Sequence, residues 1–339
     1  MEDGLLTEVR EACRAVAERA RFVRVDRERI RSYAASLPLD GAGEPVLDAA
    51  HHYLGEPEAT IAFILTLDAI NFGSGYFPFL RKRAGLSGYF TVATSLKDRF
   101  ERAGAFGAAD LARLTGSDCA TMLGQKMDGG PVEELMGLFA RALNDLGRWL
   151  GDRFDGRFDG PVAAADGSAE RLVRLLAEMP FFRDVEEYDG LDVSFYKRAQ
   201  LTTADLALTF AGKGWGRFRD LDRLTIFADN LVPHVLRVDG VLRYDAELAS
   251  RIDGGVVIEA GSQRRWRSGR GPCTRLSCWW RRCGWTICCG TGGRRRRTRR
   301  VRGTGRGRCS TEGASRTKDI EGTAKARRRA SGPFRGGSA

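Results

Sequence analysis

Apolar positions recur every three or four residues along most of the first 250 residues. This spacing predicts amphipathic helices, in segments 4–22, 26–37, 89–104, 131–153, 168–179 and 196–211. Segment 106–125 predicts two short helices joined at residues 114–117, and Ser117 or Asp118 is the expected N-cap of the second.

One helix is expected to lie at the centre of the fold. Segment 56–72 opens with a proline between two acids, as helix starts do, and then runs almost entirely apolar. Short extended pieces are expected at residues 191–195, 224–228, 234–245 and 255–260. The sequence therefore predicts one domain that is mostly α with minor β.

Charge divides the chain into two parts. Residues 263–339 contain 23 Lys and Arg against 3 Asp and Glu, whereas the first 262 residues contain 32 basic and 41 acidic groups. Six of the eight cysteines also lie in the second part. We therefore expect a folded domain over residues 1–262 and an Arg/Gly/Cys-rich tail over residues 263–339.

The tail can be interpreted in two ways. It resembles an Arg/Gly arm for RNA or DNA, although its cysteines lack the paired CxxC spacing of a zinc site. Alternatively, the tail is translated out of frame. A shift by one base turns each Cys and Trp codon between Cys273 and Cys289 into a codon for Leu, Met or Val, at the spacing of a buried helix face. We favour a frame error near residues 261–270, expect the tail as written to be disordered, and infer no partner from it.

The rest of the composition indicates a cytoplasmic protein. No apolar run reaches the roughly 18 residues that a membrane span needs. The first 16 residues form an acidic amphipathic pattern without the basic and apolar regions of a secretory signal.

Asp68 is the first candidate for chemistry, because it interrupts the apolar segment 61–70. A buried carboxylate is unfavourable unless it is paired or hydrogen-bonded. It either makes an internal hydrogen bond to the backbone or faces a ligand, and the pattern does not separate the two. Asn71 and Phe72 follow directly, before a glycine-bearing turn where a ligand can approach the backbone.

Two further segments place charged residues after aromatic or apolar ones. Lys197 follows Phe195 and Tyr196 at a helix start, where an anion is favoured, although exposed lysines are common there. Asp229 ends an apolar run before Pro233 and either forms a turn or delivers an acid into a pocket.

His51 and His52 form an adjacent pair, and histidines are more often structural than ligands. We expect no metal site and no cofactor.

Four ordered motifs together resemble the queuosine salvage family. They are LDAINFGSGYFPFL (67–80), SGYFTVATSLKDRFE (87–101), FYKRAQLTTADL (195–206) and LTIFADNLVPHVLR (224–237), and the similarity extends over essentially residues 1–262. The resemblance implies an N-glycosylase that hydrolyses queuosine 5′-phosphate and releases the base queuine for salvage into tRNA modification. It also implies a fold like that of the helical DNA glycosylases, with the base held between two helical lobes.

By the same resemblance, Lys197 and Asp229 are the expected catalytic residues. A carboxylate beside the ribosyl carbon can stabilise oxocarbenium character and orient or deprotonate water. The residues expected to bind the base and its cyclopentenediol are Asp68, Asn71, Phe72, His51, His52 and Tyr196.

Two other functions remain possible from the sequence. The first is a nucleic-acid-binding module or DNA-lesion glycosylase of similar fold, but the acidic first part lacks the excess of basic residues typical of duplex binders. The second is a non-enzymatic helical interaction protein. We therefore expect a small-molecule substrate, no direct contact with nucleic acid, no membrane and a monomer.

Overall fold

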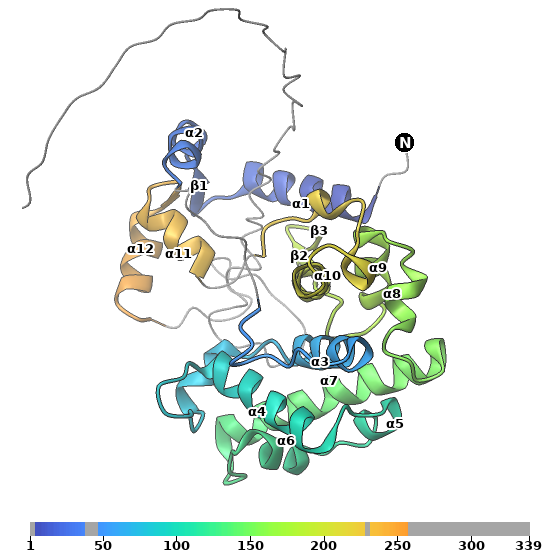
Figure 1. Cartoon of the computed structure of the whole chain (residues 1–339). Helices are drawn as coiled ribbons and strands as arrows, with labels where there is room; N and C mark the ends of the chain where they lie inside the picture. Colours follow the sequence, from blue (N-terminus) through green and yellow to red (C-terminus); the bar gives the residue numbers. More distant parts are fainter. Residues whose placement is uncertain (1–3, 38–46, 228–230, 257–339) are drawn as a thin grey trace, which may run out of the picture. The chain divides into compact units, whose positions relative to one another are not determined.

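The computed structural model of the chain describes residues 4–37, 47–227 and 231–256 (Figure 1). These residues belong to one compact unit, Met1–Gly290, and a second unit, Thr291–Ala339, lies outside them. The α-helices are α1 (Leu5–Arg19), α2 (Arg27–Ser36), α3 (Pro57–Ala69), α4 (Gly88–Ala103), α5 (Ala108–Leu111), α6 (Gly116–Leu123), α7 (Gly130–Phe154), α8 (Gly160–Ala164), α9 (Ala169–Leu176), α10 (Lys197–Thr209), α11 (Leu231–Val238) and α12 (Ala246–Asp253). Short 3₁₀ helices are η2 (Ser74–Phe79), η3 (Gly214–Gly216) and η4 (Leu221–Arg223).

Strands are few in this part of the chain. Strand β1 (Val23–Val25) pairs antiparallel with β4 (Leu242–Tyr244), and β2 (Val185–Tyr188) pairs antiparallel with β3 (Leu191–Ser194). The β2–β3 connection is the two-residue turn Asp189-Gly190, in which both residues have positive φ, as a type I′ hairpin turn requires. The expected fold class, mostly α with minor β, is confirmed.

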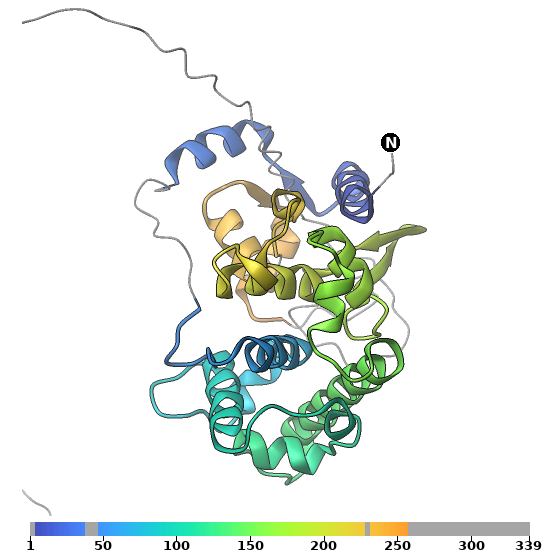
Figure 2. The ribbon, with the colours of Figure 1, turned by 45° about the vertical axis from the view of Figure 1, so that its right-hand side comes forward.

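Helix α3 lies at the centre of the main core, as its apolar run predicts. Every residue from Thr60 to Ala69 is buried. Helix α3 packs against α4 and α7 on one side and against α10 on the other, and Figures 1 and 2 both place it between these helices. Its last residue is Ala69 and its C-cap is Ile70, so Asn71 and Phe72 follow directly from its C-terminal end.

A smaller apolar cluster joins the two ends of the described chain. Its buried members are Val23, Leu236, Val241, Leu242 and Leu248, from β1, α11, the residue before β4, β4 and α12. This cluster brings α11, which follows residues 228–230, next to an N-terminal strand more than 200 residues earlier in the sequence. The pairing of β1 with β4 thus holds α11 close to the N-terminal part of the chain, although no local sequence pattern predicts it.

Several local predictions were wrong. Residues 234–238 are helical and not extended, because Pro233 is tolerated in the first turn of α11 and Leu236 then faces the smaller cluster. Residues 224–227 form no strand, and the backbone amide of Thr225 donates to the side chain of Gln200. The N-cap of α6 is Thr115, whose hydroxyl accepts from the amide of Asp118 in a capping box.

Some of the predictions from sequence concern residues that the structure does not describe. Most of segment 255–260 and the whole of the tail, residues 263–339, lie outside them, so the domain boundary at residue 262 stays a prediction. None of the helices in the described ranges is both long and apolar enough to cross a membrane.

Candidate active site

A cavity of about 470 Å³ lies where α10 meets the ends of α3 and α4 and the segment before α11. This volume falls within the range of small-molecule sites, roughly 300–1,000 Å³. Its lining consists of Leu47, Asn71, Tyr89, Lys197, Leu201, Asp205, Ile226, Phe227 and Val232. The wall therefore combines apolar surface with four polar side chains from three helical regions.

Helix α10 contributes one face to the cavity. Lys197, Leu201 and Asp205 follow one another at four-residue spacing, which places them on the same side of a helix. Eight residues correspond to about 12 Å of rise along the axis. The cavity thus has an amine near the N-terminal end of this face and a carboxyl group two turns later.

The start of α10 is already capped. The backbone amide of Lys197 donates to Oδ2 of Asp184 at 3.4 Å, and the amide of Phe195 donates to the Asp184 carbonyl at 2.8 Å. The predicted anion site at this helix start needs free backbone amides, and the amide of Lys197 is already occupied by Asp184. Tyr196, the N-cap, has a φ of 48° and packs against the apolar cores, so it does not line the cavity.

Arg198 joins α10 to the end of α3. Its guanidinium donates to the carbonyl of Ala69 at 3.4 Å and lies 4.8 Å from the centroid of the Phe72 ring. Phe72 in turn stacks on Phe181 with a centroid distance of 5.3 Å. Phe72 therefore lies in an aromatic support behind the cavity and not in its lining.

Asp68 is buried directly behind the cavity. Its Oδ1 accepts a long hydrogen bond of 3.5 Å from the amide of Asn71, which lines the cavity. Burial raises the pKa of Asp68 to about 7, against smaller opposing effects of Thr202, Asn71, Lys197 and Arg198. The internal hydrogen bond of Asp68 is therefore made to the side chain of Asn71 and not to the backbone, and a ligand-facing role of Asp68 stays a prediction.

Asp205 is a second acidic group of the same site, which the sequence interpretation missed. The pKa of Asp205 is raised to about 8, mainly by burial and also by the neighbouring Asp68, against an opposing effect of Lys197. Its position eight residues after Lys197, in a largely uncharged helix, was an available signal.

The two histidines have different surroundings. His52 is buried, and its two ring nitrogens lie 3.0 Å from the carbonyl oxygen of Asp48 and 2.9 Å from the hydroxyl of Tyr89. His51 lies 2.9 Å from the hydroxyl of Thr94 through Nδ1. His52 therefore reaches the cavity wall through Tyr89, and His51 does not belong to the lining.

The structure brings only some of the predicted residues together. Lys197 and Asn71 line the cavity, Asp68 contacts Asn71, and His52 contacts Tyr89. Asp229 lies outside the described residues, two positions after Phe227 of the cavity wall. No group of three His, Cys, Asp or Glu side chains suited to a metal ion occurs in residues 4–37, 47–227 and 231–256.

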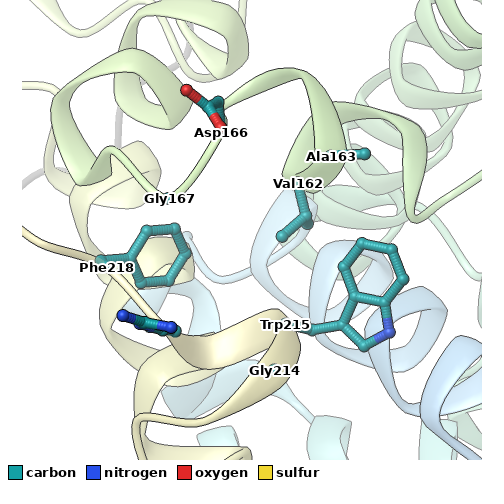
Figure 3. A pocket seen from close by; sticks show the side chains of 8 residues that line it. Val162, Ala163, Asp166, Gly167, Gly214, Trp215 and Phe218 are labelled. Carbon is teal, nitrogen blue, oxygen red and sulfur yellow. The ribbon is translucent and has the colours of Figure 1, made fainter.

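A second cavity of about 200 Å³ lies between the α8 region and the η3 turn (Figure 3). The side chains of Val162, Trp215 and Phe218 surround it, with Asp166 above them in the view. It contains none of the residues singled out from the sequence, and it is less than half as large as the α10 cavity.

Comparison with known proteins places the chain in a family. Residues 51–268 match the model of the queuosine salvage protein family. A Sphaerobacter thermophilus protein named queuosine 5′-phosphate N-glycosylase/hydrolase is 36% identical over 264 residues, covering 76% of this chain and 79% of that protein. A Bos taurus protein of the same name is 31% identical over 276 residues, covering 77% and 80%. This chain, with its cavity on α10, belongs to the queuosine salvage protein family.

Proposed function

We propose that this protein is an N-glycosylase that hydrolyses queuosine 5′-phosphate and releases queuine for salvage into tRNA modification. The observation that carries the proposal is the α10 cavity, which has the volume of a small-molecule site and places an amine and a carboxyl group on one helix face. Two relatives that carry this activity in their names align with more than three quarters of the chain.

The reaction requires charge stabilisation at the sugar. Breaking the bond between C1′ and the base nitrogen gives the ribosyl group oxocarbenium character. The base is a 7-deazaguanine with carbon in place of N7, so protonation at that position cannot assist its departure. An ionised carboxylate near C1′ therefore contributes more of the stabilisation.

We assign this carboxylate to Asp229. It orients a water molecule and takes one of its protons while the water oxygen bonds to C1′ and the C–N bond breaks. The electron pair of that bond leaves with the base, whose nitrogen then gains a proton, and the products are queuine and ribose 5-phosphate. Asp68 and Asp205 are less suited to this role, because burial raises their pKa values and favours their neutral forms.

Lys197 is proposed to bind the 5′-phosphate from the N-terminal end of the α10 face. A lysine ammonium acts on phosphate as a compact charge with three donors. Asn71 and Asp68 are proposed to hold the base, and His52 acts on it through Tyr89. Direct base contacts of Phe72, His51 and Tyr196 stay predictions, since these side chains are not in the cavity lining.

The test is to incubate the full chain with queuosine 5′-phosphate, queuosine nucleoside and a DNA duplex containing a lesion base, and to measure released base by mass spectrometry. We expect release of queuine from the monophosphate and none from the duplex. Release from the duplex alone would favour a DNA glycosylase, and no release from any substrate would refute the proposal. The cytoplasmic location and the monomeric state stay predictions.

A further inference from the structure

The hydroxyl of Tyr89 acts as a donor toward His52. The carbonyl oxygen of Asp48 can only accept, so the Nδ1 atom that faces it at 3.0 Å carries the hydrogen. Burial lowers the pKa of His52, which keeps the ring neutral and leaves a lone pair on Nε2. Nε2 therefore accepts from the Tyr89 hydroxyl at 2.9 Å. The phenol oxygen is left with acceptor capacity only, at the wall of the cavity.

When ionised, the neighbouring carboxyl groups are acceptors only as well. Asp205 lines the cavity, and its side chain makes no hydrogen bond or ion pair within the part of the chain that the structure describes. Behind it, Asp68 is only 1% exposed, and its Oδ2 has no hydrogen-bond partner among the same residues. A ligand group that meets this wall is favoured when it brings N–H donors.

The charges of Asp68, Asp205 and Lys197 do not balance when both carboxyl groups are ionised. Lys197 acts on both carboxyl groups, whereas Arg198 is the weakest influence on Asp68 and is engaged by the Ala69 carbonyl and the Phe72 ring. Two ionised carboxylates beside one lysine carry one net negative charge. Burial favours a proton on this pair of carboxyl groups, and a bound cation can replace that proton.

We propose that Asp205, backed by Asp68 and flanked by Tyr89, receives a positively charged amine of the ligand. The site then selects nucleoside 5′-monophosphates whose base carries such an amine. This inference rests on the proposed function, because the base of queuosine carries a secondary amine on a methylene group and this amine is protonated at neutral pH. The base also has a neutral N–H edge, which could meet the same acceptors, and the experiment distinguishes the two sources.

The experiment compares two 5′-monophosphates that share the 7-deazaguanine edge, one with a cationic 7-aminomethyl group and one with a neutral 7-cyano group. The readout is the ratio of their kcat/KM values, which does not depend on the total amount of active enzyme. We expect the wild type to prefer the cation by about tenfold or more, the effect of one charge-assisted hydrogen bond. In Asp205→Asn the ratio should approach one, and in the exposed-loop control Asp128→Asn it should equal that of the wild type.

The inference would be overturned if Asp205→Asn still preferred the cationic analogue, or if the wild type had no preference. Either result would indicate that Asp205 contacts the N–H edge that both bases share. Absence of turnover by the wild type on both analogues and on queuosine 5′-phosphate would instead refute the proposed function. A second measurement needs only the wild type, so it also tests the inference if the variant does not fold.

Calorimetric binding of the two free bases at pH 7, in buffers of different ionisation enthalpy, should show proton release with the 7-aminomethyl base only. Equal proton release with both bases would overturn the inference.

Discussion

We expect the Asp68→Asn variant to be more stable than the wild type at pH 8 and to gain much less at pH 5. Asparagine has nearly the same shape and can still accept from Asn71, but it has no charged form. In the wild type the folded protein holds the proton of Asp68 more tightly than the unfolded chain does, because burial raises the folded pKa. Ionisation of Asp68 therefore lowers the stability of the wild type as the pH rises from about 4 to about 7.

The magnitude follows from the two pKa values. The folded value of about 7 and the ordinary value of 3.8 differ by about three pH units, which corresponds to about 4 kcal/mol at high pH. At pH 5 only about 2 kcal/mol of this has been lost, since ionisation in the unfolded chain has begun and that in the folded protein has not. Burial of an unpaired amide in the variant costs about 1–3 kcal/mol at either pH.

The difference between the two pH values removes this constant cost and leaves about 2 kcal/mol. For a domain of this size, that corresponds to about 4–8 °C in Tm. The assay is thermal unfolding of wild type, Asp68→Asn and the control Asp128→Asn at pH 5 and pH 8. A Tm difference between Asp68→Asn and wild type that is equal at both pH values, or smaller at pH 8, would refute the reasoning. The control should give no such difference.

Four other outcomes are expected. Asp229→Asn should retain substrate binding and lose on the order of 10²-fold in kcat, because an amide carries no charge to meet the oxocarbenium; near-normal turnover would move the catalytic carboxylate elsewhere. Lys197→Ala should reduce kcat/KM for queuosine 5′-phosphate far more than for the nucleoside, and equal losses would place Lys197 at the sugar. Borohydride should trap no adduct with the wild type, and a trapped adduct would show covalent catalysis. Gln200→Ala should destabilise the protein by about 1–3 kcal/mol in urea unfolding, since the Thr225 amide loses its acceptor; an unchanged midpoint would show that another group replaces it. Sequencing of the genomic locus should reveal one inserted or missing base upstream of Cys273, and an intact reading frame would contradict the frame error.

The central helix illustrates what a local pattern can predict. Pro57 after Glu56 marks the helix start, and the apolar residues that follow exclude an exposed position, so both the element and its burial follow from neighbouring residues. Lys197 and Asn71 were also found from sequence, because each sits next to a recognisable helix end and within a family motif.

Tyr89 and Asp205 were missed for a physical reason. Each is a member of an amphipathic helix. The spacing aligns Asp205 with Lys197 on one helix face, but only packing decides whether that face meets a cavity. Phe72 also lies in a family motif; its ring contacts the guanidinium of Arg198, and its expected contact with the base stays a prediction.

Helical periodicity and the positions of helix ends and turns thus depend on residues within a few positions of one another, and the sequence alone determines them. The pairing of Asp68 with Asp205 and the contact of His52 with Tyr89 join residues that lie 137 and 37 positions apart. Their pKa values and hydrogen-bond roles come from the water excluded when α3, α4 and α10 pack together. Desolvation is a property of the assembled core, so the tertiary structure alone decides which of these acids holds its proton.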